Sequence, residues 1–366
     1  MLSRRRFAAS LPLLGEAAFA QRATLPAEIP KGAVYLNANE NPEGPPHNAM
    51  ELMTRSLADT GRYHYEEFPF FYEDVAASEG LDASQVVVGA GSSEVLHNAV
   101  DAFTGPSRPL ITMEPTYELP AAIARAHGRP VIAVPLTKGY GADVRRMAEA
   151  ARQAGGGLIY ICNPNNPTSS LTLRSDISWL VVNLPPNTVA LIDEAYLHYA
   201  QGPDAVSAVH WVRLGRSVIV TRTFSKIYGM AGLRVGFGCA RPDLIEKLAA
   251  FRSNVISVVG MRAARGALGQ APSLIPQRRA KLVETRSALT AWLKLKGFGF
   301  IEPQASFVMI ETGRDTAPLI ANMAKNGVVV GRQFPPLTTM LRVSIGTGEE
   351  MARFRDVFLK AVNTAP

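Results

Sequence analysis

Lys226 is a primary amine placed shortly after a predicted strand. The apolar run at 218–220 is suited to a strand buried on both faces of a sheet, and it leads into a polar turn with Thr223, Ser225 and Lys226. Arg234 follows eight residues after the lysine. Two hydroxyl groups and a guanidinium suit an anion such as phosphate, and an amine beside a phosphate site indicates a Schiff base with a phosphorylated aldehyde. A lysine that extends from a strand end into solvent is the alternative interpretation of Lys226 taken alone.

A second arrangement suited to an anion occurs earlier in the chain. The apolar run 86–88 predicts a short buried strand, and apolar residues at helical spacing predict a helix over 94–103. Between them, Gly91, Ser92 and Ser93 would point free N–H groups and the positive end of the helix dipole at a phosphate. Many α/β proteins use such a turn only for packing, so this pattern needs support from other residues.

Strands and helices alternate through the middle of the chain. The predicted strands are 86–88, 110–113, 131–135, 158–161, 189–192 and 217–220, and the predicted helices between them are 94–103, 119–126, 142–153 and 175–182. Such alternation indicates a mostly parallel sheet covered by helices on both faces. Polar residues follow several of these strands at their carboxyl ends, where open α/β sheets bind ligands. We therefore expect the chemistry to lie at one edge of the sheet.

The remaining segments predict an α/β fold with a second, smaller α+β domain. Helices are predicted at 47–58, 242–251, 258–268, 273–295, 317–325 and 349–362, and short strands at 307–310, 328–330 and 341–345. The aromatic residues Phe68, Phe70, Phe71 and Tyr72 are typical of a core or a subunit interface. The expected division is an extended N-terminal arm at 21–46, a large domain at 47–255 and a small domain at 256–366.

Composition excludes several classes of protein. The chain has 366 residues with 47% hydrophobic and 19% charged residues, which is typical of a globular protein of enzyme size. Its formal charge of +7 comes from scattered Lys and Arg, so we expect no nucleic-acid partner. The two cysteines are not spaced as metal ligands, and we expect neither a disulfide scaffold nor a metal site. No apolar run is long enough for a membrane span, so no stable membrane insertion is expected.

The first twenty residues resemble an export signal. Arg4, Arg5 and Arg6 precede a short apolar stretch, and Ala18 and Ala20 flank a phenylalanine in the pattern of a signal-peptidase site. The paired arginines resemble a twin-arginine signal, which implies export to the periplasm of a folded enzyme with its cofactor loaded. The alternative is a basic N-terminal tail on a cytoplasmic protein.

A pyridoxal phosphate site needs several kinds of group, and this chain offers each of them after a predicted strand. Lys226 supplies the amine for the aldehyde, and Asp193 supplies a carboxylate that keeps the pyridine nitrogen protonated. Asn166 and Tyr196 supply donors to the ring oxygen, and Tyr117 supplies a flat side chain against the ring. The alternatives are a helix cap for Asp193, a turn residue for Asn166 and a core residue for Tyr117. Their joint occurrence favours the cofactor.

The motifs resemble those of the class I/II, fold-type I aminotransferases, and within them the histidinol-phosphate aminotransferase-like branch. The resemblance covers about residues 35–358. It rests on LNANENP at 36–42, PTY at 115–117, CNPNNPT at 162–168, DEAY at 193–196, TFSK at 223–226, AGLRVGF at 231–237 and LRVSIGT at 341–347. This resemblance implies the fold named above and pyridoxal 5'-phosphate as the cofactor.

Carried over position by position, the resemblance implies a role for each motif residue. Lys226 would form the Schiff base and shuttle the proton, with Asp193 and Tyr196 as its catalytic partners. Arg342 would hold the substrate carboxylate, and Arg332 and Asn41 would contact the substrate. The implied cofactor-binding residues are Gly91, Ser92, Ser93, Tyr117, Asn166, Asp193, Tyr196, Thr223, Ser225, Lys226 and Arg234, together with Tyr63. Tyr63 would come from a partner subunit, which implies a homodimer.

Two positions depart from the family pattern. Tyr63-His64-Tyr65 stands where the family has Tyr-Pro-Asp, so this segment is expected to set the substrate preference of this protein. Ser169 stands where the family has glycine, and we expect serine to be tolerated there if the backbone angle is not left-handed.

The resemblance implies transamination between an amino-acid-like and possibly phosphorylated amine and a 2-oxo acid. The same site would serve both substrates in turn, which gives ping-pong kinetics. Two alternatives stay open: a decarboxylase or lyase on the same scaffold, for instance one similar to threonine-phosphate decarboxylase, and an exported binding protein without activity. Conversion of the cofactor to its amine form by an amino donor would distinguish transamination from the first alternative. Turnover of any donor would distinguish an enzyme from the second.

Overall fold

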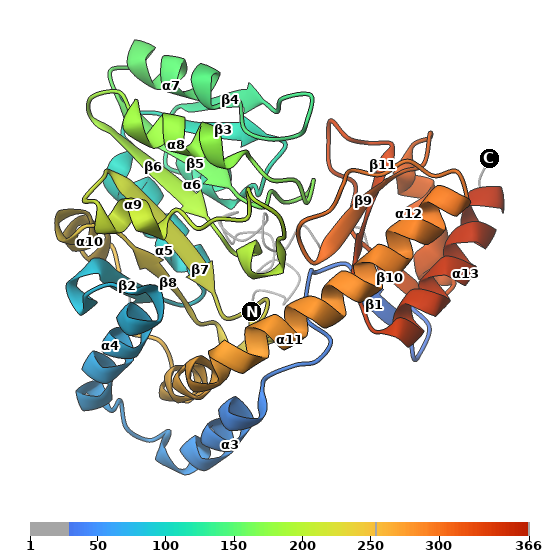
Figure 1. Cartoon of the computed structure of the whole chain (residues 1–366), viewed down its shortest axis with the longest axis horizontal. Coiled ribbons are helices and arrows are strands. Elements are labelled where there is room, and N and C mark those ends of the chain that lie inside the picture. Colours follow the sequence, from blue (N-terminus) through green and yellow to red (C-terminus); the bar gives the residue numbers. More distant parts are fainter. Residues whose placement is uncertain (1–28, 253–254, 365–366) are drawn as a thin grey trace, which may run out of the picture.

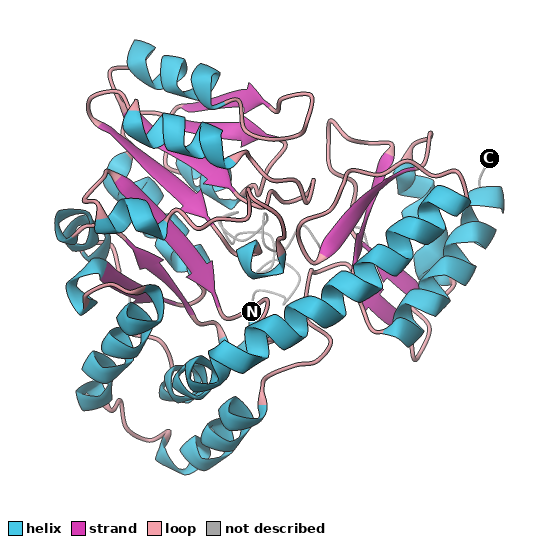
Figure 2. Cartoon of the chain, in the orientation of Figure 1, coloured by secondary structure: helices cyan, strands magenta, loops and turns pink. Residues whose placement is uncertain are grey.

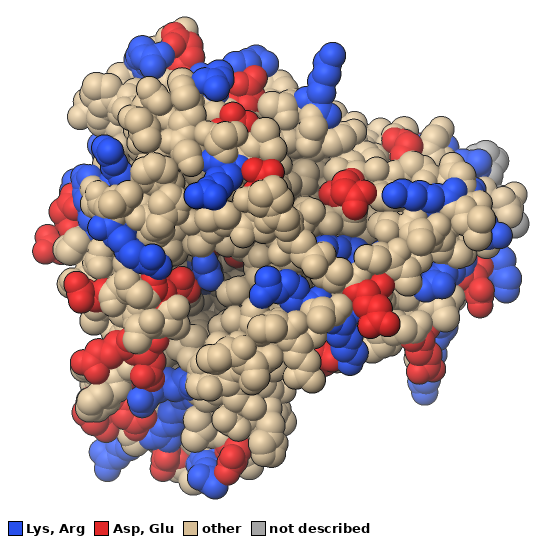
Figure 3. Space-filling model, viewed as in Figure 1, with Lys and Arg blue, Asp and Glu red and all other residues tan. Residues whose placement is uncertain are grey.

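The computed structural model describes residues 29–252 and 255–364. The predicted export signal at 1–20, and the arm up to residue 28, lie outside the described residues. The chain forms two lobes, and one long helix runs from the larger lobe to the smaller one (Figure 1). No helix among the described residues is long and apolar enough to cross a membrane. Basic and acidic side chains are interspersed over the face seen in Figure 3.

A seven-stranded sheet forms the centre of the larger lobe. Its strands are β2 (Val86–Gly89), β3 (Leu110–Glu114), β4 (Val131–Pro135), β5 (Gly157–Cys162), β6 (Thr188–Asp193), β7 (Val218–Thr223) and β8 (Gly236–Cys239). They lie in the order β2-β8-β7-β6-β5-β3-β4, and β8 runs antiparallel to β2 and β7, while the other neighbouring pairs are parallel. The predicted mostly parallel sheet is therefore confirmed. Strand β8 was not predicted, because it is a short, glycine-rich sequence.

Helices cover both faces of this sheet (Figure 2). Successive residues of a strand point to opposite faces, so the apolar runs of β5, β6 and β7 supply both layers of the core. Ile159, Ile161, Ala190, Ile192, Val218 and Val220 belong to one core cluster, and Leu158, Tyr160, Val189, Leu191 and Ile219 to the other. The first layer is completed by α4 (Phe68–Glu79), α7 (Val144–Gln153), α8 (Arg174–Val182) and α9 (Val209–Arg213), and the second by α5 (Ser92–Phe103), α6 (Leu119–Ala126) and α10 (Pro242–Ala249).

The helix that joins the lobes, α11 (Val258–Leu295), is continuous for 38 residues. The prediction of two helices, at 258–268 and 273–295, was wrong. Pro272 and Pro276 lie inside the helix and remove two backbone hydrogen bonds. Buried residues toward both ends hold the helix in place, since Met261 packs in the core of the larger lobe and Leu289 in that of the smaller lobe.

The smaller lobe contains two pairs of strands. Strands β9 (Phe307–Glu311) and β11 (Met340–Ser344) are antiparallel, while β1 (Val34–Leu36) is parallel to β10 (Val328–Val330). Helices α12 (Thr316–Lys325) and α13 (Gly348–Thr364) complete its core. Because β1 belongs to this lobe, the segment after it must cross to the larger lobe before α3 (His47–Ser56) begins. This crossing brings residues 38–40 over the carboxyl edge of the large sheet.

Helix α11 packs closely against α3 through a glycine. A Cβ atom on Gly266 would lie 2.9 Å from both the Asn48 carbonyl oxygen and Leu52 Cδ1, whereas Gly269 in the same helix has open space around it. Overpacking costs about 1–3 kcal/mol, and glycine to alanine in an open helical position gains up to about 1 kcal/mol. We therefore expect Gly266→Ala to lower the midpoint of thermal unfolding and Gly269→Ala to keep or raise it. Equal shifts in the two variants would contradict this packing.

Candidate active site

The parallel strands bring the predicted site residues to one edge of the sheet. Asp193 ends β6, Lys226 follows β7 by three residues, and Tyr117 follows β3 by the same number. They line a cavity of ≈ 230 Å³. Its predicted lining residues are Ser92, Ser93, Tyr117, Asn166, Asp193, Tyr196, Thr223, Ser225, Lys226, Arg234 and Arg342, and it is closed by Ala38, Asn39 and Glu40 from the crossing segment.

Lys226 extends into this cavity. Its Nζ atom donates to the carbonyl oxygens of Asn39 at 3.1 Å and Ala38 at 3.3 Å, and lies 5.4 Å from the centre of the Tyr196 ring. Burial, with the charge of Arg342 as the next cause, lowers the pKa of the Lys226 amine to about 8. A larger fraction of this amine than of an ordinary lysine is therefore neutral near physiological pH, and the neutral form is the nucleophile toward an aldehyde.

Asp193 is a buried carboxylate surrounded by neutral donors. It accepts hydrogen bonds from Thr221 Oγ1 at 3.0 Å, from the Ala195 N–H at 3.2 Å and from the Tyr160 hydroxyl at 3.3 Å. Burial raises the pKa of Asp193 to about 6, although these hydrogen bonds oppose the rise. A carboxylate in this position would be stabilised by a cation, which is what a protonated pyridine nitrogen provides. Sequence reasoning missed Tyr160 and Thr221; Thr221 lies opposite Asp193 in the β6–β7 register.

The predicted anion cradle is assembled from three segments. Thr223 Oγ1 donates to Ser225 Oγ at 2.9 Å, and Arg234 Nη1 lies 3.4 Å from the same Ser225 oxygen. Helix α5 begins at Ser92 beside them, so its free N–H groups and dipole face the same space. Two glycines make this approach possible. A Cβ atom at Gly91 would lie 2.5 Å from Arg234 Nη2, and one at Gly236 would lie 2.1 Å from the Ser92 nitrogen.

Arg342 lies fully buried at the side of the cavity formed by the smaller lobe. Its Nη1 donates to Asn166 Oδ1 at 2.7 Å and its Nη2 to the Asn37 carbonyl oxygen at 2.6 Å, while its Nε has no partner among the described residues. Burial lowers the pKa of Arg342 to about 10. A buried guanidinium with a free N–H and no carboxylate partner in the described part of the chain fits an incoming carboxylate.

Arg332 lies in a neighbouring cavity of ≈ 440 Å³ rather than in the first one. Its Nη2 donates to Glu118 Oε2 at 2.5 Å, and its guanidinium stacks 4.3 Å from the centre of the Phe334 ring. Arg234 and Arg342 also line this second cavity, which is therefore rich in guanidinium groups. Glu118 was not identified from the sequence, because only the folded chain brings it to Arg332.

Three predicted residues, Gly91, Asn41 and Tyr63, are not among the lining residues of either cavity. Asn41 donates to the Ile227 carbonyl oxygen at 3.1 Å and supports the loop that carries Lys226. Tyr63 has 69% of its surface exposed and stacks on Tyr65, with ring centres 5.1 Å apart. The cavity instead contains Asn39, which the sequence analysis did not single out. Asn39 Nδ2 donates to the Tyr196 hydroxyl at 3.1 Å, and Ser344 Oγ donates to Asn39 Oδ1 at 3.0 Å.

Ser169 has a left-handed backbone, with φ of 62°. The condition under which serine was expected to be tolerated here is therefore not met. Its hydroxyl compensates for the strain, because Oγ accepts hydrogen bonds from the Ala305 N–H at 2.8 Å and the Gln304 N–H at 3.2 Å. Serine is therefore tolerated at this turn through contacts that glycine could not make.

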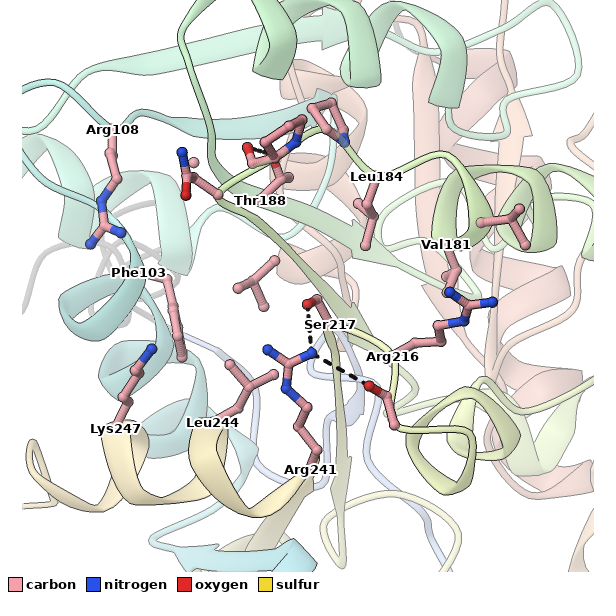
Figure 4. Close-up of a pocket in the computed structure, with 17 residues that line it drawn as sticks. Phe103, Arg108, Val181, Leu184, Thr188, Arg216, Ser217, Arg241, Leu244 and Lys247 are labelled. Atoms are coloured by element: carbon pink, nitrogen blue, oxygen red, sulfur yellow. Dashed lines mark hydrogen bonds between the residues drawn. The ribbon is translucent and has the colours of Figure 1, made fainter.

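A larger hollow of ≈ 510 Å³ opens at the opposite edge of the sheet. Arg108, Arg216, Arg241 and Lys247 lie around it, and Arg241 bonds Ser217 and the Gly215 carbonyl group (Figure 4). None of the predicted site residues lines this hollow. Ligands of open α/β sheets bind at the carboxyl edge, so we assign the active site to the smaller cavity.

Comparison with known proteins identifies the family. Residues 31–358 match the family Aminotransferase class I and II, and the chain belongs to it. The chain is 33% identical over 333 residues to a histidinol-phosphate aminotransferase of Symbiobacterium thermophilum, covering 90% of each chain. It is 31% identical over 299 residues to an aromatic amino acid aminotransferase of Cutibacterium acnes, covering 81% of this chain and 84% of the other.

A solved structure shows the same fold. The histidinol-phosphate aminotransferase from Sinorhizobium meliloti, in complex with pyridoxal 5'-phosphate, superposes with a TM-score of 0.86 at 24% identity, covering 100% of this chain and 99% of that one. The predicted fold class is therefore confirmed. The protein is a pyridoxal-phosphate-dependent aminotransferase that acts on an amino-acid-like substrate.

The lowered pKa of Lys226 makes a testable prediction for the cofactor-free protein. Since the neutral amine reacts with acetic anhydride, Lys226 should reach half of its maximal acetylation rate near pH 8. An ordinary lysine reaches it near its pKa of about 10.4. Trace labelling between pH 6 and 11, read by peptide mass spectrometry, measures the midpoint at each lysine. A midpoint at Lys226 equal to that of ordinary lysines would contradict the electrostatic account of the site.

Proposed function

We propose that this aminotransferase prefers an amino donor with an anionic group on its side chain, such as a phosphorylated amine or a dicarboxylic amino acid. The observation that carries this proposal is Arg332, whose guanidinium lines the cavity beside the cofactor site and is needed neither for the cofactor phosphate nor for the α-carboxylate. Arginine binds phosphate and carboxylate groups by paired hydrogen bonds. The similarity to a histidinol-phosphate aminotransferase supports the same class of donor.

The donors of the first cavity suit each part of the cofactor. Pyridoxal 5'-phosphate, when bound, supplies an electron sink for the bond broken at the substrate α-carbon. Lys226 would hold the cofactor through its amine, and Asp193 would keep the ring nitrogen protonated. The phosphate would be held by the cradle formed by Ser92, Ser93, Thr223, Ser225 and Arg234. Gly91, which has no side chain, would leave space for it. Tyr117 would pack on the ring, and Asn166 would contact its oxygen.

The proton transfer would belong to Lys226. Once the substrate amine replaces it, the freed Nζ can act as a base and take a proton from the substrate α-carbon. It can then act as an acid and give this proton to the former aldehyde carbon of the cofactor. Its lowered pKa places it near the operating pH for both tasks. Tyr196 receives a hydrogen bond from Asn39, so its own O–H is free to donate toward the ring oxygen. Arg342 would orient the α-carboxylate of the amino donor and then of the 2-oxo acid.

Glu118 would compete with an anionic substrate for Arg332. The pair is partly exposed, with 53% of the Glu118 and 20% of the Arg332 side chain accessible, so it contributes at most about 1 kcal/mol. We expect Glu118→Gln to lower KM for anionic donors by about two- to five-fold and to leave neutral aromatic donors unchanged. Arg332→Gln should raise KM for the anionic donors alone.

A donor panel tests the proposed preference together with these variants. It contains histidinol phosphate, glutamate, aspartate, phenylalanine and tyrosine, each with 2-oxoglutarate or pyruvate as acceptor, and the measurement is kcat/KM. Preference for the neutral aromatic donors, or an equal effect of both substitutions on all donors, would contradict the anionic assignment while leaving transamination itself intact.

We also propose a homodimer in which Tyr63 completes the active site of the partner subunit. Its support is the exposure of Tyr63, Tyr65 and Phe70 in the single chain, which leaves an aromatic surface in contact with water, together with the family resemblance. Tyr63 would then reach the phosphate cradle across the interface.

Complementation between two variants tests the shared site. We expect Lys226→Ala homodimers to be inactive and Tyr63→Ala homodimers to be weak. A heterodimer of the two, purified through two different tags, contains one site with both native residues and should regain about half of the wild-type activity. Tyr63→Phe is the matched control for loss of the hydroxyl alone. Heterodimer activity no higher than the mean of the two homodimers would contradict sharing.

We propose, finally, that residues 1–20 direct export by the twin-arginine route. The support is the Arg4–Arg5 pair before the apolar stretch and the small residues at 18 and 20. Changing both Arg4 and Arg5 to Lys should retain the protein in the cytoplasm, whereas the unchanged chain should reach the periplasm. Fractionation of the expressing bacterium with a periplasmic marker enzyme measures this, and an unaltered distribution would count against export.

A further inference from the structure

Three side chains that commonly bind metals converge on the outer surface of the larger lobe. His97 and Asp101 lie one turn apart on α5, and His127 directly follows the last residue of α6. His97 Nε2 lies 3.4 Å from Asp101 Oδ2, and His127 Nδ1 lies 2.8 Å from Asp101 Oδ1. The three ligand atoms all lie within 4.8 Å of one another. None of the three lines the active-site cavity.

One of these separations already matches the coordination sphere of a small divalent metal, and all three ligand atoms are close enough to reach one ion. Zn²⁺ binds His nitrogen and carboxylate oxygen at about 2.0–2.2 Å with tetrahedral geometry, which places neighbouring ligand atoms about 3.3–3.6 Å apart. The His97–Asp101 distance already has this value, and rotation of the partly exposed His97 and His127 side chains would bring the other two pairs to it. Two imidazoles and one carboxylate suit Zn²⁺, and also Co²⁺, Ni²⁺ or Cu²⁺, better than Mg²⁺ or Ca²⁺.

Arg129 limits the affinity of such a site. Its Nη1 lies 3.0 Å from Asp101 Oδ1 and also donates to the Val100 carbonyl oxygen and to Thr104 Oγ1, so it is anchored beside the cluster. It orients the carboxylate, yet its positive charge repels a metal ion. Asp101 Oδ2, which faces His97, is the oxygen that Arg129 leaves open.

We propose that His97, Asp101 and His127 form a divalent transition-metal site with water in the fourth position, for which Zn²⁺ is the probe. The bound ion would link the second and third turns of α5 to the end of α6. Because α5 begins at the predicted phosphate cradle, the link would stabilise the helix that carries it. The role is structural, and the sequence did not predict it because the third ligand lies 26 residues from Asp101.

Zinc titration of the chelator-treated, dialysed holoenzyme by calorimetry tests the proposal. We expect one equivalent per chain at this site. His97→Gln, Asp101→Asn and His127→Gln should each weaken its binding at least about ten-fold, in line with the loss of a ligand, and Arg129→Gln should tighten it. Co²⁺ substitution should give the visible absorption of a tetrahedral complex, which is lost in Asp101→Asn.

His64→Gln is the matched control. His64, Glu66 and Glu67 form a second cluster, but Glu67 already binds the Arg262 guanidinium through both of its oxygens. The zinc equivalent should persist in His64→Gln. Its loss in that variant, or equal zinc binding by the wild type and His97→Gln, Asp101→Asn and His127→Gln, would overturn the proposal. The midpoint of thermal unfolding of each variant, measured in the presence of chelator, shows whether the variant is still folded. Weaker zinc binding by a folded variant then reports the loss of a metal ligand.

Discussion

The burial of three ionisable groups at the carboxyl edge of one sheet is the constraint on which the site depends. Burial shifts the pKa of Lys226 down to about 8, that of Arg342 down to about 10 and that of Asp193 up to about 6. Each shift favours the neutral form, because burial in this cavity is unfavourable for all three charges. A ligand with a ring cation and a carboxylate offsets this cost. The site is therefore electrostatically complementary to pyridoxal phosphate with an amino acid.

The fold creates this constraint through parallel strand register. Parallel pairing of β3, β5, β6 and β7 places their carboxyl ends side by side. Asp193 ends β6, and the segments after the other three strands carry Tyr117, Asn166 and Lys226. The smaller lobe supplies Arg342, and the crossing segment after β1 closes the cavity over Lys226. Because both lobes contribute, the packing of α11 on each core sets the geometry of the site.

Local pattern was enough to predict most of this arrangement. The alternation of apolar runs predicted six of the seven strands of the large sheet, and polar residues after them predicted Lys226, Asp193 and the phosphate cradle. What the sequence could not provide were contacts across strands and between lobes. The positions of Thr221 and Tyr160 around Asp193, of Asn39 beside Tyr196 and of Glu118 beside Arg332 follow from register and lobe closure. The continuity of α11 through two prolines depends on packing at both of its ends.

Covalent attachment of the cofactor to Lys226 is the claim on which the account depends, and borohydride reduction of the purified holoenzyme tests it most directly. Reduction fixes the cofactor to the amine that holds it, and peptide mass spectrometry identifies that amine. The account predicts the cofactor mass on the peptide that contains Lys226, and none on any peptide of Lys226→Ala. Attachment to another lysine, or retention of the adduct in Lys226→Ala, would contradict it.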